Sequence, residues 1–317
     1  MRNRTRFVFL GLGLGAALLS LLFLLLQQVA PHAARLLPEA DAVVFLNVKL
    51  LRTATHLDRT PVQRSPDFQH FIDATGIVPE RDLDAAAFAI HRMADPTGPN
   101  GPVAFSEVFE GRFDGDRLGR YLASIASGRE TYAGHVVYTI PIEGRTLRLV
   151  QLGSHALAAS NMPTTEQIHG MVDRDHFSVN PFSGSSLVSG LFGSVPLFSG
   201  AWGIGRLGLP FAENGRISVN GLALPFSPDA EFVASLRYTT SLHLRIEQIA
   251  ASESDAARST DQLKTLLQIF HTLQQASPST PSLQKFTDSI RIEQHKDRSI
   301  ITADIPAGAL SGLTATN

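Results

Sequence analysis

The chain has 317 residues and no cysteine, and its 27 basic and 29 acidic side chains give a formal net charge of −2. The missing cysteine excludes disulfides, thiolate metal sites and a cysteine nucleophile. No block of basic residues alternates with aromatic residues, so the composition predicts no nucleic-acid partner.

The N-terminus combines three arginines before residue 7 with an uncharged apolar run from Phe7 to Leu26. As a helix, about 20 apolar residues span the ~30 Å hydrocarbon core of a membrane. Positive charges before the run favour a cytoplasmic N-terminus. We therefore expect residues 1–35 to form a cytoplasmic tip, a single transmembrane helix in the inner (cytoplasmic) membrane and a tether, with the bulk of the chain in the periplasm or outside. Cleavage near Ala30, as in a signal peptide, is the alternative.

Three glycines at the start of the apolar run raise a second interpretation, a loop that binds phosphate. A dinucleotide site needs the spacing G-x-G-x-x-G and an acidic residue about 20 positions later. Here Gly11, Gly13 and Gly15 give G-x-G-x-G, and the first acidic residue is Glu39. The pattern therefore favours a membrane helix, whose small residues allow another helix to approach closely.

Residues 36–175 are predicted to form a first α+β lobe. The run from Ala42 to Val48 is continuously apolar, which is typical of a strand covered on both faces. A helix is expected from Ser65 to Gly76, because a polar cap precedes its apolar stripe and a glycine ends it. The next segments predict two strands, a helix, three strands and a helix, in the order "DAAAFAIHR", "PVAFSEVFEGRF", "DGDRLGRYLASIAS", "GHVVYTIP", "RTLRLVQLG", "HALAASN" and "TTEQIHGMVDR".

Residues 176–317 are predicted to form a second lobe, because the preceding stretch Asp173–Ser186 is polar and rich in Gly, Pro and Ser. Strands are expected in "EFVASLRYT" and "SLHLRIEQIA", followed by an amphipathic helix and the hairpin "SIRIEQHKDRSIITADIP". This order is typical of a β-α-β-β unit in a ferredoxin-like layer. The predicted fold class is α+β, with two ferredoxin-like-type lobes of mainly antiparallel sheet and packed helices.

The stretch from Leu191 to Phe226 contains only three charged residues among many large apolar ones. One interpretation is that it forms sheet core. The other is an apolar surface around Phe198 and Trp202 that meets a protein partner or a second copy of the chain.

One segment combines residue types that bind metals. His169, Asp173, Asp175 and His176 lie within eight residues, and imidazole with carboxylate suits zinc or manganese. The same pattern also fits a solvated helix end, where histidine is electrostatically favourable. These residues are weak metal candidates.

No other pattern indicates catalysis. The chain has no G-x-S-x-G nucleophile motif and no H-E-x-x-H zinc motif. Glu107 and Glu110 lie on one predicted strand, but nothing in the sequence singles out either carboxylate. The sequence therefore predicts no catalytic residue and no cofactor.

Several segments together are similar to a known type of protein: the anchor, "LPEADAVVFLNV", "FEGRFDGDRLGRYLASIA", "YAGHVVYTIP" and the C-terminal helix and hairpin. Their shared pattern is a strand ending in G-R-F-D, a helix, and then Y-x-G-x-x-x-Y at Tyr132, Gly134 and Tyr138. They resemble bacterial envelope proteins of unassigned function, which have an N-terminal membrane anchor and a duplicated α+β ectodomain. The resemblance implies no catalytic residues. We expect a periplasm-facing envelope protein that works by binding or as a scaffold. The alternative is an exported hydrolase or metal-dependent enzyme whose site assembles only in the fold.

Overall fold

The structure is a computed structural model, and it describes residues 29–55, 64–98, 100–142, 144–177, 184–206, 212–213, 216–219, 222–223, 230–239, 241–276 and 281–305. The predicted anchor, Phe7–Leu26, lies outside these ranges and stays a prediction. Within the described ranges, no helix is both long enough and apolar enough to cross a membrane.

The first half of the chain contains a run of short helices and seven strands. They are α2 (His32–Leu36), β1 (Ala42–Leu46), α3 (Val48–Thr55), α4 (Pro66–Thr75), α5 (Pro79–Asp82), β2 (Leu83–Arg92), β3 (Val103–Gly111), α6 (Gly115–Ile125), β4 (Gly128–Tyr132), β5 (His135–Ile142), β6 (Arg145–Leu152), β7 (Ala156–Ser160) and α7 (Glu166–His176).

The second half contains five long strands, three short ones and four helical segments within the described ranges. They are α8 (Ser186–Leu191), the 3-10 turn η2 (Phe192–Ser194), β8 (Ala201–Arg206), β9 (Ala212–Glu213), β10 (Arg216–Val219), β11 (Leu222–Ala223), β12 (Glu231–Tyr238), β13 (Leu242–Ile249), α9 (Glu253–Ala276), α10 (Pro281–Ser289), β14 (Arg291–His295) and β15 (Arg298–Ile305).

Local signals set several helix boundaries as the sequence predicts. The Ser65 side chain accepts a hydrogen bond from the Phe68 backbone N–H at the start of α4, and Gly76 ends that helix with a φ of 75°. Asp114 caps α6 in the same way, through the backbone N–H of Arg117. Each cap satisfies a backbone group that the first helical turn leaves unpaired. The short helices α2, α3, α5, α8 and α10 and the strands β4 and β8 are not predicted.

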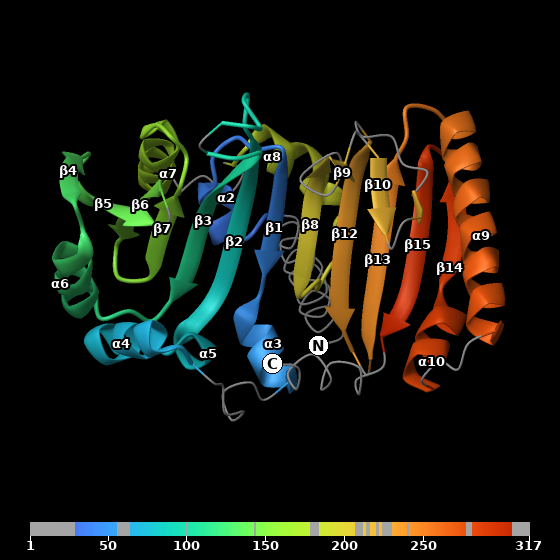
Figure 1. The fold of residues 1–317 in the computed structure, drawn as a ribbon, viewed down its shortest axis with the longest axis horizontal. Coiled ribbons are helices and arrows are strands. Elements are labelled where there is room, and N and C mark those ends of the chain that lie inside the picture. Colours follow the sequence, from blue (N-terminus) through green and yellow to red (C-terminus); the bar gives the residue numbers. More distant parts are fainter. Residues whose placement is uncertain are drawn as a thin grey trace, which may run out of the picture.

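One antiparallel sheet of twelve strands runs through both halves, in the order β14-β15-β13-β12-β8-β1-β2-β3-β7-β6-β5-β4 (Figure 1). The α+β class with mainly antiparallel sheet is therefore confirmed. The expectation of two separate ferredoxin-like lobes is not met, because β1 pairs with β8 from Ala42–Gly205 to Leu46–Ala201. This pairing joins the halves and removes the two exposed strand edges that separate lobes would have.

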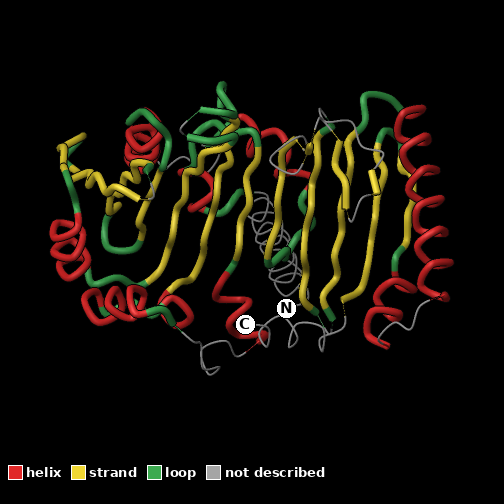
Figure 2. The backbone as a smooth tube through the Cα atoms, viewed as in Figure 1, coloured by secondary structure: helices red, strands yellow, loops and turns green. Residues whose placement is uncertain are grey.

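The two halves nevertheless follow a similar chain path. In each half a short helix precedes a first strand of the large sheet, two further strands of that sheet follow after an intervening segment, and a longer helix comes next. The neighbouring strands run β1-β2-β3-β7-β6 in one half and β8-β12-β13-β15-β14 in the other (Figure 2). The central antiparallel pair therefore relates the halves by an approximate two-fold rotation.

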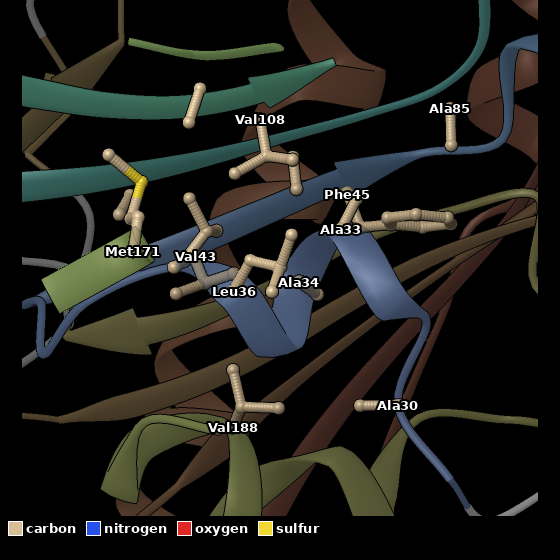
Figure 3. Packing of buried hydrophobic residues seen from close by; sticks show 14 of the residues in the cluster. Ala30, Ala33, Ala34, Leu36, Val43, Phe45, Ala85, Val108, Met171 and Val188 are labelled. Atoms are coloured by element: carbon tan, nitrogen blue, oxygen red, sulfur yellow. The ribbon is translucent and has the colours of Figure 1, made fainter. Parts of the chain in front are cut away.

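The main hydrophobic core lies on one face of the sheet, which we call the covered face. Alternate residues of the central strands point to it, including Val43, Phe45, Trp202 and Ile204, and all four are buried. They pack with buried residues of α2, α7 and α8, which cover this face (Figure 3).

The apolar stretch after Leu191 divides between core and surface. Trp202 is 4% exposed, and its ring lies 5.5 Å from that of Phe45 and 5.3 Å from that of Phe192, centroid to centroid. Phe198 is 68% exposed. Trp202 therefore belongs to the core, and the predicted contact surface is reduced to the neighbourhood of Phe198.

Replacing Trp202 with alanine should lower the free energy of unfolding by about 3–5 kcal/mol, because it leaves a large cavity between the rings of Phe45 and Phe192. Urea unfolding of the full-length chain, followed by circular dichroism, measures this loss. The control Phe198→Ala removes an exposed ring and should change stability by less than about 0.5 kcal/mol. Equal losses in the two variants would show that Trp202 is not a core residue.

Candidate functional site

The first two of the four metal candidates connect α7 to the edge strand β4. The Nε2 atom of His169 donates to Glu130 Oε1 at 2.7 Å, and its ring stacks on Tyr132 with 3.8 Å between centroids. The hydroxyl of Tyr132 donates to Asp173 Oδ2 at 3.0 Å, and this hydrogen bond raises the pKa of the Tyr132 phenol. All four side chains have partners within the protein, so this cluster holds β4 against the helix.

The other two candidates lie elsewhere. His176 donates from Nε2 to the carbonyl oxygen of Ala133 at 3.3 Å. Asp175 lines a cleft of about 550 Å³ that also includes the pair His32 and Glu110, whose Nδ1 and Oε1 atoms are 2.6 Å apart. Among the residues that the structure describes, no three His, Asp or Glu side chains are arranged to hold a metal ion.

The structure also places a hydroxyl, an imidazole and a carboxylate in line, which the sequence does not predict. His243 bonds through Nδ1 to Asp304, while its Nε2 lies 2.9 Å from Thr239 Oγ1 and 3.3 Å from Ser241 Oγ. His243 and Asp304 are cross-strand neighbours on β13 and β15. Their side chains are 37% and 58% exposed. The order of groups matches a hydrolase triad, but the carboxylate of such triads is usually buried.

The sheet face opposite the covered face is different in character, and we call it the open face. It consists of three cross-strand rows over β3, β2, β1, β8, β12, β13 and β15, with one residue per strand in each row. The central row is Glu107, Phe88, Val44, Gly203, Ala234, Ile246 and Ile301. The flanking rows are Phe109, Ala86, Leu46, Ala201, Leu236, Leu244 and Ala303, and Phe105, Ile90, Ala42, Gly205, Phe232, Gln248 and Ser299.

Burial distinguishes the central row from the covered face, while Ala86, Phe232, Gln248, Ser299 and Ala303 of the flanking rows are themselves buried. Every residue of the central row is only half-buried, whereas the covered-face residues next to it in sequence, such as Val43, Val108 and Val233, are buried. The continuous apolar run in β1 predicts a strand covered on both sides. Only one of those sides has a helix packed across the middle of the sheet within the described residues.

Helices bound the open face at its two ends. At one end α6 packs through Leu118 and Leu122 on Leu149 and Ala159 of the sheet. At the other end Thr260 of α9 donates a hydrogen bond to Ser299 of β15 at 2.9 Å. Figure 1 shows both helices at opposite ends of the long sheet. The uncovered part of the open face therefore lies between them, because Ser299 in a flanking row is already covered by α9.

Glu107 is the one ionisable residue among these three rows. Its cross-strand neighbour is Phe88, and Phe105 and Phe109 flank it on its own strand. The rings of Phe88 and Phe109 meet edge to face, 5.8 Å apart. Burial raises the pKa of the Glu107 carboxyl, and the carboxyl makes no hydrogen bond or ion pair within the described part of the chain.

The raised pKa of Glu107 predicts a pH-dependent stability. The folded protein holds this proton more tightly than the unfolded chain, whose glutamate pKa is about 4.3. Protonation of Glu107 therefore stabilises the folded state fully below about pH 4, and this contribution is lost as the pH rises through the pKa of Glu107 in the folded protein. Glu107→Gln, which resembles the protonated form, should match the wild type at pH 4 and be more stable at pH 8.

Urea unfolding at the two pH values tests this prediction. The matched control is Glu110→Gln on the same strand, which removes an equal charge from the opposite face and breaks the contact with His32. That variant should gain no stability at pH 8. A Glu107→Gln variant that is no more stable than the wild type at pH 8 would contradict the prediction.

Comparison with known proteins gives only distant structural likenesses. No protein-family model matches the chain, and no curated protein matches it. Crystal form III of TP0453 has a TM-score of 0.47 and 12% identity, covering 90% of this chain and 99% of that one. Crystal form I of TP0453 has a TM-score of 0.42 and 11% identity, covering 90% and 97%. We draw no functional argument from a likeness this distant.

Proposed function

We propose that this is a membrane-anchored, periplasm-facing envelope protein that works by binding, and that the open face is its binding surface. The observation that supports the proposal is the central row of half-buried residues, apolar except for Glu107, in the middle of the sheet. Contiguous apolar surface of this kind usually marks an interaction site in a soluble domain.

The size of the open face supports this reading. Seven strands at about 4.8 Å spacing span roughly 29 Å, and three rows cover roughly 14 Å along the strands. The product, about 400 Å², is the footprint of the three rows and not their accessible area, because Ala86, Phe232 and Ala303 of the flanking rows are buried. The surface left for a ligand is the half-buried central row and its half-buried neighbours, and covering these apolar side chains would favour binding.

Two further features support the location and a role in association. The arginines and the apolar run Phe7–Leu26 favour an inner-membrane anchor with the sheet on the periplasmic side. Leu197 and Phe198 are both exposed, which supports a second contact surface for a protein partner or another copy of the chain. Trp202 does not belong to that second contact surface, because its side chain is buried in the core.

Single-cysteine variants test both parts of the proposal, because the natural chain has no cysteine. In spheroplasts, a membrane-impermeant maleimide should label Asp116→Cys, on the exposed surface of α6, from the periplasmic side. Val44→Cys, in the central row, should react several-fold more slowly in spheroplasts than in the purified protein, since an occupant covers it.

The two cysteines also act as controls for each other. Asp116→Cys should react equally fast in both preparations, because no contact is proposed there. If it reacts only after lysis, the topology is wrong. If Val44→Cys reacts equally fast in both preparations, the open face is unoccupied in the envelope and the binding proposal fails.

The alignment of Ser241, His243 and Asp304 favours a second candidate function, hydrolysis of an ester or amide. In such a reaction His243 would accept the proton of the attacking hydroxyl, and Asp304 would orient the imidazole. If this function holds, a fluorophosphonate probe should label the full-length chain. Labelling should disappear in Ser241→Ala and fall at least tenfold in His243→Gln.

Thr239→Val is the matched control, because it removes the other hydroxyl near His243 Nε2. It should leave the labelling of Ser241 intact. Absence of labelling in the wild type, or labelling that survives Ser241→Ala, would exclude the second candidate.

A further inference from the structure

We propose that the open face binds a cationic amphiphile, with its ammonium group at Glu107 and its apolar tail along the central row. The inference rests on the proposed binding function and names the chemical class of the ligand. Three observations support it: the position of the one charge, the absence of a cation on the same face, and the shape of the row.

The surroundings of Glu107 favour a positively charged group. A carboxylate among apolar side chains is costly unless a cation or hydrogen-bond donor meets it. Phe88, Phe105 and Phe109 surround this carboxylate on the same face, and aromatic rings attract ammonium groups through their π-electron faces. An ammonium group would therefore interact favourably with the carboxylate and the rings together.

The described residues of the three rows do not supply that cation. None of the three rows contains Lys, Arg or His, so a second copy that presented the same face would bring none. Residues 306–317, which follow β15, contain no basic residue. Ala30, near the other end of the described chain, packs in the core of the covered face. We therefore place an external molecule, and not a described part of the chain, at Glu107.

The central row has a polar end and an apolar body. Beyond Glu107 it continues through six apolar positions, with the small residues Gly203 and Ala234 near its middle. A Cβ atom added at Gly203 would meet nothing closer than Val44 Cγ2 at 3.7 Å, so there is room above the backbone. This pattern matches a head group followed by an alkyl tail. The face offers no base for a phosphate, so the ligand has a cationic head and no anionic group.

The experiment uses the full-length chain in phosphatidylcholine nanodiscs, with Ala234→Cys as a reporter in the row. We measure how dodecyltrimethylammonium, dodecanol and dodecyl sulfate slow its reaction with a maleimide. The ammonium compound should give half-maximal protection at an about tenfold lower concentration than dodecanol, corresponding to about 1.4 kcal/mol. Dodecyl sulfate should protect least. Partition into the bilayer is the same for every variant and cancels when variants are compared.

Three variants test whether the preference for the ammonium compound arises at Glu107. Glu107→Gln in the reporter background should remove the preference for the ammonium compound, so that it protects no better than dodecanol. Glu110→Gln, which changes the same strand on the covered face, should keep the tenfold preference. Gly203→Leu, which fills the row, should weaken protection by all three amphiphiles. Circular dichroism and the fluorescence of Trp202 confirm that each variant is folded.

The outcomes separate this inference from the proposed function. Equal protection by dodecanol and the ammonium compound, or a preference that survives Glu107→Gln, overturns the cationic head group and leaves apolar binding in place. If no amphiphile protects the reporter while Val44→Cys is shielded in spheroplasts, the occupant is a protein. The cationic-amphiphile inference is then wrong, and the proposed binding function stands. If the cysteine is free in both settings, the inference and the proposed function fall together.

Discussion

The antiparallel pairing of β1 with β8 is the interaction on which the rest of the structure depends. Its register sets Phe45 beside Trp202 and Val43 beside Ile204 on the covered face. Since successive residues of a strand point to opposite faces, the same register sets Val44 beside Gly203 on the open face. One set of backbone hydrogen bonds therefore joins the halves, assembles the core and creates the apolar surface opposite it.

Glycine makes this close pairing sterically feasible. Gly205 has a φ of 150°, and a Cβ atom there would lie 2.6 Å from the Cα atom of Ala42 on the neighbouring strand. A larger residue would push β8 away from β1 and disturb the contact of Trp202 with Phe45. Gly203, two residues earlier, has space above its backbone, and its missing side chain leaves a shallow depression in the middle of the open face. The two glycines thus have different roles, one in joining the halves and one in shaping the surface.

Local stability and binding place opposite demands on the open face. A half-buried carboxyl with no partner among the described residues raises the free energy of the folded state, and a row of incompletely buried apolar residues forgoes part of the hydrophobic stabilisation. Exceptions of this kind to the usual rules of folding are typical of functional surfaces. By contrast, the His169, Tyr132, Glu130 and Asp173 cluster is satisfied internally, and its role is to hold an edge strand.

Features that depend on neighbours in the chain follow from the sequence: most of the long strands and helices, a polar cap before α4, and the exclusion of disulfides. Which strand faces are covered follows only from the packing of helices on the sheet. Strand alternation places Glu107 and Glu110 on opposite faces of β3. Only the packing of α2 on one of those faces decides that Glu110 is covered and Glu107 is not. Trp202 and Phe198 occur in one apolar run, yet the pairing of β8 buries the first and leaves the second exposed. The pairs His243–Asp304 and β1–β8 join residues far apart in the chain, and such contacts leave no local pattern to detect.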